Sequence, residues 1–161
     1  LGDMRTIRLD QSFDAVLIHD ASSYLLTEED LRDTFRTASY HLRSNGILLV
    51  EPDWVEETFP NGWTFAWERT KGNIKVKIEE SMVDPDPSDS QVESTYTYTI
   101  QMDGVLSVER DIHVTGLFPT GTWTKLLEEA GFSVELRPLP PNEGGYGKWL
   151  FVSVWEPKDR P

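Results

Sequence analysis

Residues 13–20, with the sequence FDAVLIHD, and residues 47–53, with the sequence ILLVEPD, share a pattern in which a short apolar run leads into acidic residues. The apolar residues, AVLI at 15–18 and ILLV at 47–50, are consecutive instead of alternating with polar ones. Unbroken runs of this length are typical of strands that are covered on both faces in a parallel sheet. We therefore expect two neighbouring parallel strands.

The segment between these runs predicts a helix that begins after Thr27. Acidic residues occupy positions 28–30, and negative charge in a first helical turn is favoured by the unpaired backbone amides and the helix dipole. The sequence Ser44-Asn45-Gly46 is expected to end the helix. Apolar residues recur in the helix at spacings of three and four, and they form one stripe that can pack on a sheet: Leu31, Phe35, Ala38 and Leu42.

The strand ends define a candidate ligand site. A strand-helix-strand connection of this kind is right-handed, which places the carboxyl ends of both strands on the same rim of the sheet. The first strand ends at His19 and Asp20, and the second at Glu51-Pro52-Asp53. Because open sheets bind ligands at that rim, we predict that these side chains face a ligand.

The composition limits the classes of partner. The chain has 161 residues, enough for one domain, and a formal net charge of −13, which argues against nucleic acid or an anionic membrane surface as a partner. It contains no cysteine, which excludes disulfides, thiolate catalysis and zinc-thiolate sites, and we find no metal-ligand spacing. No apolar segment is long enough to cross a bilayer, and no signal peptide is recognised. We therefore expect a soluble, cytoplasmic protein.

The middle of the chain predicts an aromatic cover followed by a meander. Residues 54–67 are rich in Trp and Phe but irregular, which favours a lid over the sheet edge. Apolar residues then alternate with polar ones in the segments 74–78, 92–102 and 106–114, which predicts a three-stranded antiparallel insert. To keep the apolar residues on one face, we expect a three-residue loop or bulge at 103–105.

This predicted register assigns a face to each polar side chain of the third strand. It places Arg110 on the apolar face beside Tyr98. His113 falls on the other face, with Glu109 and Asp111. His113 is a candidate base toward an amine, because histidine can exchange protons near neutral pH. The alternative is a polar-face residue paired with a neighbouring carboxylate.

The last third of the chain returns to the core. Residues 119–130 predict a second helix, and Gly131 is expected to end it as a left-handed cap. A short strand follows at 134–137. Residues 148–155 are apolar on both sides, so this strand is expected to be central in the sheet.

The order of these elements resembles the later two-thirds of a class I S-adenosylmethionine-dependent methyltransferase. In that family a final antiparallel strand lies beside the fifth strand, which is where residues 148–155 fall. The insert resembles the substrate-covering sheet of small-molecule N-methyltransferases, such as glycine N-methyltransferase and the nucleotide-sugar N,N-dimethyltransferases. The resemblance spans the whole chain and rests on Gly2-Asp3-Met4, the strand ending at His19-Asp20, the helix from Thr27, the strand ending at Glu51-Pro52-Asp53, the helix ending in LLEEAGF at 126–132, and the final strand.

The resemblance implies a fold, an activity and a cofactor. Residues 1–161 are interpreted as a single partial methyltransferase domain of the α/β class, an incomplete doubly wound, Rossmann-like sheet with a three-stranded antiparallel insert. Residues 1–53 and 116–157 form the core, and 54–115 form the insert or lid. The intact protein is expected to use S-adenosyl-L-methionine to methylate a small-molecule acceptor at an amine nitrogen.

One part of the family pattern is missing. The glycine-rich loop that holds the methionine end of the cofactor is not found, and neither is the acidic residue that binds the ribose. The run Gly144-Gly145-Tyr146-Gly147 does not replace that loop, because it precedes a strand instead of opening a helix. We therefore expect a fragment that is inactive alone.

The resemblance also implies roles for single residues. Asp3 and Met4 match the pair that contacts the adenine, and His19 and Asp20 fall where the family places groups that face cofactor and substrate. The full set of candidates is His19 and His113 for catalysis, Asp3, Met4, His19 and Asp20 for the cofactor, and Tyr24, Glu51, Asp53 and Arg110 for the substrate. Structural interpretations stay open as alternatives: a frayed terminus for Asp3 and Met4, and a cap or loop anchor for Glu51 and Asp53.

Two other functions remain as alternatives at this point. The first is a non-catalytic, methyltransferase-like module used for interaction or dimerisation. The second is a different enzyme on a doubly wound sheet, such as a reductase. In a fragment, residues 13–19 would form an exposed strand edge, and we expect a homodimer through that edge or its cover by another segment.

Overall fold

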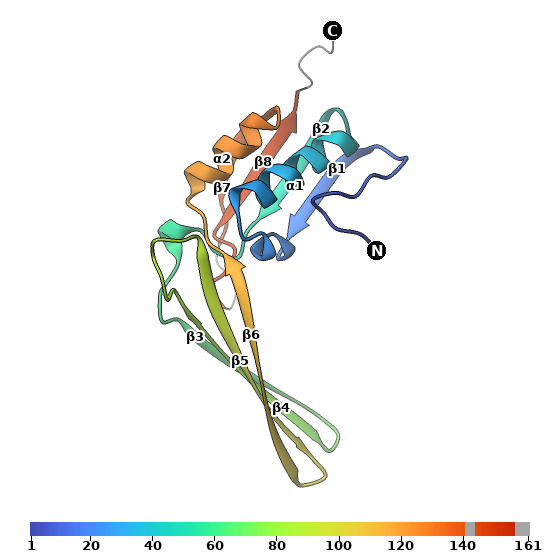
Figure 1. Ribbon diagram of the computed structural model, residues 1–161. Coiled ribbons are helices and arrows are strands. Elements are labelled where there is room, and N and C mark those ends of the chain that lie inside the picture. Colours follow the sequence, from blue (N-terminus) through green and yellow to red (C-terminus); the bar gives the residue numbers. More distant parts are fainter. Residues whose placement is uncertain (141–143, 157–161) are drawn as a thin grey trace. The chain divides into compact units, whose positions relative to one another are not determined.

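The computed structural model describes residues 1–140 and 144–156. The chain divides into two compact units (Figure 1). The first comprises Leu1–Phe59 and the described residues 116–140 and 144–156, and the second comprises Pro60–Thr115. In the described residues each unit contains one four-stranded sheet.

The sheet of the first unit contains the parallel pair that the apolar runs predict. Strand β1 (Phe13–His19) pairs in parallel with β2 (Leu42–Glu51). Strand β8 (Trp149–Trp155) lies between β2 and β7 (Phe132–Pro138) and is antiparallel to both. The parallel arrangement and the central, antiparallel place of the last strand are therefore confirmed.

Helix α1 (Glu28–His41) connects the parallel strands and begins with a capping box. The Thr27 hydroxyl accepts a hydrogen bond from the Asp30 amide, and the Asp30 carboxylate accepts one from the Thr27 amide, both at 3.1 Å. The helix ends at His41 and β2 starts at the next residue, so the expected end at 44–46 is wrong. Leu42 is buried as the first residue of the strand.

Replacing Thr27 with alanine is expected to lower the free energy of unfolding by about 1 kcal/mol, because the Asp30 amide loses its acceptor at the helix start. Thr27→Ser keeps the hydroxyl and is the matched control. Urea unfolding followed by circular dichroism measures both variants. Equal stability of the serine and alanine variants would show that the capping box contributes nothing.

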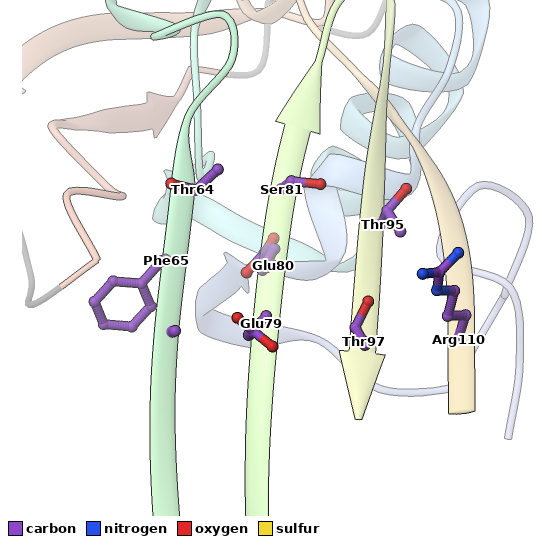
Figure 2. A pocket seen from close by; sticks show the side chains of 9 residues that line it. Thr64, Phe65, Glu79, Glu80, Ser81, Thr95, Thr97 and Arg110 are labelled. Carbon is purple, nitrogen blue, oxygen red and sulfur yellow. The ribbon is translucent and has the colours of Figure 1, made fainter. Parts of the chain in front are cut away.

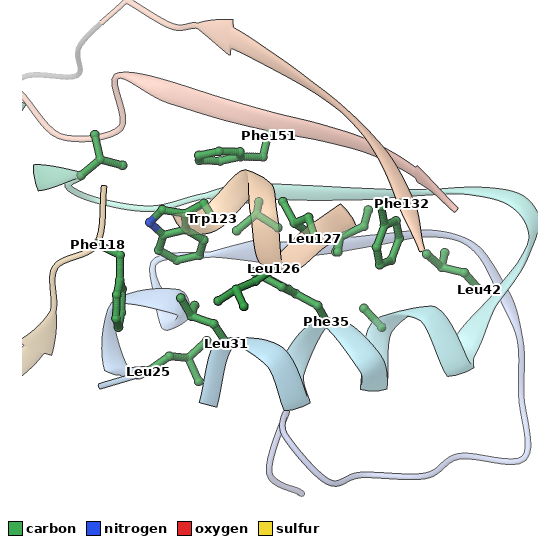
Figure 3. Packing of buried hydrophobic residues seen from close by; sticks show 14 residues of the cluster. Leu25, Leu31, Phe35, Leu42, Phe118, Trp123, Leu126, Leu127, Phe132 and Phe151 are labelled. Atoms are coloured by element: carbon green, nitrogen blue, oxygen red, sulfur yellow. The ribbon is translucent and has the colours of Figure 1, made fainter. Parts of the chain in front are cut away.

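The core of the first unit lies between the sheet and the helices α1 and α2 (Thr120–Glu129). Figure 3 shows the facing side chains of both helices, with Trp123 between Phe35 and Phe151. Short 3-10 turns at Ala21–Tyr24 (η1) and Glu56–Thr58 (η2) flank this core. Among the described residues, no helix is both long and apolar enough to span a membrane.

In the described part of the chain, α1 and α2 pack together on one face of this sheet (Figure 1). On the other face, Leu17 and Ile47 are 66% and 39% exposed, so the expectation that both faces of these strands are covered is wrong for the described residues. The α/β class is confirmed. The helices on both faces that a doubly wound sheet requires are not found in the described residues.

The sheet of the second unit has the order β3-β4-β5-β6, so the prediction of a three-stranded insert is wrong. The additional strand is the aromatic segment that was expected to be irregular. Aromatic residues favour strands, and here they alternate with other residues from Trp63 to Trp67, a period that the neighbouring Pro60 and Gly62 obscure. The strands are β3 (Thr64–Lys71), β4 (Ile74–Val83), β5 (Gln91–Met102) and β6 (Val105–Gly116).

The expected three-residue loop between the last two strands is also wrong. Strand β5 ends at Met102 and β6 starts at Val105, so Asp103 and Gly104 alone connect them. Their φ angles are 51° and 79°, the left-handed values that a type I′ turn needs. Residues 105–112 are all exposed, so no buried face enforces the register, and the turn residues decide it.

Candidate functional site

The carboxyl ends of β1 and β2 form the rim that the sequence singles out. His19 and Glu51 are directly opposite each other in the last register pair of these parallel strands. These two predicted residues therefore lie side by side, as expected.

His19 lies between two carboxylates. Its Nδ1 atom is 2.7 Å from Oδ1 of Asp20, and its Nε2 atom is 3.6 Å from Oε2 of Glu51. The first is a close contact between a ring nitrogen and a carboxylate oxygen, and the second is longer than a hydrogen bond. Nε2 is therefore the ring nitrogen that is left for a ligand, and the side chain is 52% exposed.

Asp20 has an unusual backbone conformation. Its φ and ψ angles are 45° and −54°, although the residue is not glycine. Such a conformation costs about 1–3 kcal/mol and persists only where the surroundings impose it, most often at functional sites. Here it brings the Asp20 carboxylate back toward the imidazole of His19.

Asp53 is anchored by groups that the sequence did not single out. The hydroxyl of Ser23, which is buried in η1, donates a hydrogen bond to Oδ2 of Asp53 at 2.8 Å. The amide of Gly147 donates to the carbonyl oxygen of Asp53 at 2.9 Å. Tyr24, the next residue in η1, is exposed. Thus η1 and the loop that contains Gly147 both reach the end of β2.

Gly147 fits closely against the rim. Its φ is 62°, and a Cβ atom at this position would collide with Oε1 of Glu51. The positive φ favours glycine at this position, whereas the Glu51 carboxylate, at the end of a flexible side chain, can shift to admit a Cβ atom. The glycine-rich run had been set aside because it does not open a helix. Its contact with the rim depends on tertiary structure, which no local sequence signal reveals.

Aromatic residues fix the same loop. The rings of Trp54 and Tyr146 have centroids 5.3 Å apart, and Nζ of Lys148 lies 5.7 Å from the ring centroid of Trp54. Trp54 belongs to the segment that was predicted to be a lid. In the structure it is buried in the first unit and packs on the loop.

Asp3 and Met4 are held at the start of α1. Two nitrogens of the Arg5 guanidinium, Nε and Nη2, donate to Asp3, the latter at 2.7 Å, and Nη1 donates to Asp30 at 2.6 Å. Asp30 lies in the first turn of α1, so Arg5 ties the amino-terminal segment to that turn. Met4 is partly buried against the core.

The Arg5 guanidinium lowers the pKa of Asp3 to about 2 by hydrogen bonding. Because the folded pKa is below the ordinary value of 3.8, the pair stabilises the fold fully above pH 4, and this contribution is lost as the pH falls toward about 2. An NMR titration of the side-chain carboxyl carbons should show Asp3 with a midpoint near 2, moving toward 3.8 in Arg5→Gln. Asp86, whose pKa is lowered by Ser88, is the internal control and should not change.

Arg110 and His113 belong to the second unit. Arg110 lines a groove of about 520 Å³ together with Thr95 and Thr97 (Figure 2), so its predicted place beside Tyr98 is wrong. The two-residue turn explains this, because a register shift of one residue moves a side chain to the other face. Nε2 of His113 is 3.1 Å from Oδ2 of Asp111, so the expected pairing with a neighbouring carboxylate is confirmed. Its ring lies 4.9 Å from that of Tyr96, so the prediction that it lies on the face opposite the tyrosines is wrong, for the same reason.

The described residues contain no group of three or more His, Asp or Glu side chains that could hold a metal ion. The candidate site of the first unit is therefore a rim of one imidazole and several carboxylates. Such a rim can accept hydrogen bonds, orient an amine or a hydroxyl group, and take up a proton.

Comparisons with known proteins agree on one kind of enzyme. No family model matches the chain. A dTDP-3-amino-3,4,6-trideoxy-alpha-D-glucopyranose N,N-dimethyltransferase from Streptomyces venezuelae is 32% identical over 155 residues, which cover 95% of this chain and 62% of that protein. A dTDP-4-amino-2,3,4,6-tetradeoxy-D-glucose N,N-dimethyltransferase from Saccharopolyspora spinosa is 27% identical over 156 residues, which cover 96% of this chain and 59% of that protein.

Solved structures agree with the sequence relatives. The crystal structure of Streptomyces venezuelae DesVI matches with a TM-score of 0.82 at 28% identity, covering 96% of this chain and 63% of that one. A SAM-bound amino pentose methyltransferase from Micromonospora echinaspora matches with a TM-score of 0.83 at 21% identity, covering 95% of this chain and 62% of that one. At this identity the match supports the fold alone. The chain thus spans less than two thirds of the relatives it matches. The resemblance to class I S-adenosylmethionine-dependent methyltransferases is confirmed. Nearly the whole of this chain aligns with a sugar N,N-dimethyltransferase, and the alignment covers 62% of that enzyme's length.

Proposed function

We propose that the chain supplies the later part of an S-adenosylmethionine-dependent methyltransferase that methylates the amine of a nucleotide-linked amino sugar. The observation that carries this proposal is the parallel pair β1-β2, whose rim brings His19 beside Glu51 in a chain 32% identical to a sugar N,N-dimethyltransferase. The three relatives found among curated proteins all act on dTDP-linked amino sugars, which favours a nitrogen acceptor.

The residues present could hold one part of the cofactor, its adenosyl group. Carboxylates accept hydrogen bonds from amine and hydroxyl groups, which suits Asp3 for the adenine and Asp20 for the rest of the cofactor. Met4 can pack on the adenine ring. A glycine-rich loop that opens a helix is not found in the described residues, so the groups that would hold the methionine end are missing from this part of the protein. When bound, S-adenosylmethionine supplies an activated methyl group.

The remaining rim residues receive roles toward the acceptor. We assign His19 as the proton acceptor, because its Nδ1 atom contacts the Asp20 carboxylate while its Nε2 atom is 3.6 Å from that of Glu51. Tyr24, Glu51 and Asp53 are assigned to acceptor binding at the same rim. Methyl transfer requires little covalent help from a protein, so these residues mainly align the amine and exclude water.

A fusion protein tests the proposal. The part of the Streptomyces venezuelae relative that this chain does not match is placed before Leu1, and the fusion is compared with the chain alone. The fusion should bind S-adenosylmethionine in calorimetry and methylate a dTDP-linked amino sugar, detected by mass spectrometry, while the chain alone should do neither. A folded fusion that binds the cofactor but methylates no amino sugar would contradict the proposed acceptor.

We further propose that the chain associates with itself through the edge of β1. This strand is at the end of the sheet order in the described residues, and its Leu17 side chain is 66% exposed. An unpaired apolar edge favours strand pairing. Sedimentation should detect dimers that Leu17→Lys weakens and that Leu106→Lys, an equally exposed leucine in the second unit, does not. A wild-type chain that is monomeric at all concentrations would refute this association.

A further inference from the structure

His41 is a buried side chain that the rim does not use. It is the last residue of α1, and it is only 5% exposed. The chain contains two other histidines, His19 and His113, whose side chains are 52% and 30% exposed. Buried polar groups need hydrogen-bond partners, so the contacts of the His41 ring show what this ring holds in place.

Both nitrogens of the His41 ring contact the backbone. The Leu9 amide donates a hydrogen bond to Nε2 at 2.8 Å, and Nδ1 lies 2.7 Å from the carbonyl oxygen of Thr37, one helical turn earlier. An amide N–H can only donate, so Nε2 carries no proton and Nδ1 is the nitrogen that donates to Thr37. The arrangement therefore holds the neutral form of the imidazole.

The bond from Leu9 is one of several that attach the amino-terminal segment, residues 1–12, to α1. At the start of the helix, Nη1 of Arg5 donates to a carboxylate of the first turn at 2.6 Å. Near the end of the helix, Nη1 of Arg8 donates to the Thr37 hydroxyl at 2.8 Å. The segment is therefore attached near both ends of α1, and the imidazole belongs to the second attachment.

The same segment helps to line an apolar pocket of about 230 Å³. Met4, Ile7 and Leu9 line the pocket from the segment, and His41 is among the residues that line it from α1. The proposed function assigns Met4 to the adenine ring. The hydrogen bond that fixes Leu9 therefore also supports the wall of the pocket that contains Met4.

Proton uptake would reverse the role of Nε2. The Leu9 amide and the protonated Nε2 would then be two donors that face each other without an acceptor. The carboxyl end of α1 favours a positive charge on His41, while the guanidinium of Arg8 at Thr37 opposes it. The neighbouring elements carry further titratable or charged side chains: Asp10 in the segment, Arg36 and Tyr40 in α1, and Asp14 in β1, which pairs with Arg43 in β2 at 2.7 Å.

We propose that His41 is a positioning residue for the adenine of the cofactor, because its neutral ring holds the Leu9 amide and thereby keeps the segment that carries Met4 packed on α1. Protonation of His41 releases the segment around Leu9. The inference rests on the proposed function for the role of Met4. It deepens that function by making cofactor binding depend on the charge of a histidine away from the rim.

The first experiment follows the Leu9 amide by NMR in the whole, ¹⁵N-labelled chain from about pH 8 to about pH 5.5, where imidazoles titrate. Its protection against solvent exchange, relative to an unfolded peptide, should fall by about tenfold in step with the ring signals of His41. The Leu31 amide, which donates to a carbonyl at the start of α1, should stay protected. Asp3 stays ionised and paired with Arg5 over this range, because the guanidinium lowers the pKa of Asp3 to about 2.

Three variants separate the acceptor role of His41 from its charge. His41→Gln offers Leu9 an amide oxygen that does not titrate, so the protection of the Leu9 amide should no longer depend on pH. His41→Phe keeps a ring but has no acceptor, so the amide should lose protection at every pH. His113→Gln, in the second unit, is the matched control and should behave as the wild type. If the His41 variants fail to fold, the wild-type titration and the His113→Gln control decide the inference.

Cofactor binding is measured with the fusion protein. The affinity for S-adenosylmethionine in calorimetry should fall about two- to tenfold on acidification over the same pH range in the wild type, and the fall should be smaller in His41→Gln.

The outcomes separate this inference from the proposed function. A Leu9 amide that stays protected while His41 titrates, or an equal loss of affinity in the wild type and His41→Gln, would overturn the inference even if the fusion protein methylates amino sugars. A Leu9 amide that is released by protonation of His41 would support the hold of His41 on the segment, and a fusion protein that binds no cofactor would then contradict the proposed function alone.

Discussion

Replacing Trp123 with alanine is expected to lower the free energy of unfolding by about 3–5 kcal/mol, because it empties the centre of the core. Trp123 is 1% exposed, and its ring stacks on Phe151 with centroids 5.8 Å apart at 29°. It also contacts Phe35 and Phe118, each with centroids 6.1 Å away. Helix α2, helix α1 and strand β8 therefore all lose a partner. Urea unfolding monitored by circular dichroism measures the loss.

Trp123→Phe is the matched control for this loss. The indole Nε1 atom of Trp123 is buried with no hydrogen-bond partner in the described residues. Phenylalanine removes that unsatisfied donor while it keeps an aromatic ring, so part of the packing loss is offset. We expect a much smaller destabilisation than in Trp123→Ala. An alanine variant as stable as the phenylalanine variant would contradict the central place of this ring.

In the fusion protein that tests the proposed function, His19→Asn should lower the methyl-transfer rate by about 10²–10⁴-fold, the usual contribution of a positioned base. Asparagine keeps a polar side chain of similar length near Asp20 and Glu51 but cannot take up a proton. The decrease should fall on kcat, while binding of S-adenosylmethionine measured by calorimetry changes little.

His113→Asn distinguishes the two histidines that the sequence singled out. His113 lies in the second unit and contacts Asp111 and Tyr96, so we expect a smaller decrease in its variant than in His19→Asn. If His113→Asn abolishes the reaction while His19→Asn keeps a rate within tenfold of the wild type, the assignment of the base to His19 is wrong.

The parts of the fold that could be predicted are those in which burial constrains the sequence. The apolar runs at 15–18 and 47–50 correctly predict the parallel pair, and Leu48 and Val50 are fully buried, whereas Leu17 and Ile47 are exposed. Helix α1 was predicted from its cap and stripe. The register at Asp103-Gly104 was not, because residues 105–112 are exposed and their apolar pattern reports no buried face.

The candidate site also contains contacts that the sequence could predict and contacts that it could not. His19 and Glu51 could be placed together from topology alone, since parallel strands connected by a helix end on one rim. The contacts of Ser23 with Asp53 and of Gly147 with Glu51 depend on how η1 and a distant loop return to that rim. No periodicity or spacing in the sequence encodes such contacts.

The exposed strand β6 has a consequence for local opening. It lies at the end of its sheet in the described residues, and its apolar side chains at Val105, Leu106 and Ile112 are all exposed. With so little burial to oppose fraying, the amide hydrogens from Val105 to Ile112 should exchange with deuterium from the solvent much sooner than those of Leu48 and Val50, which are fully buried in β2. Mass spectrometry of deuterated peptides would show the tip of the β5-β6 hairpin opening and closing many times while the parallel strands stay protected.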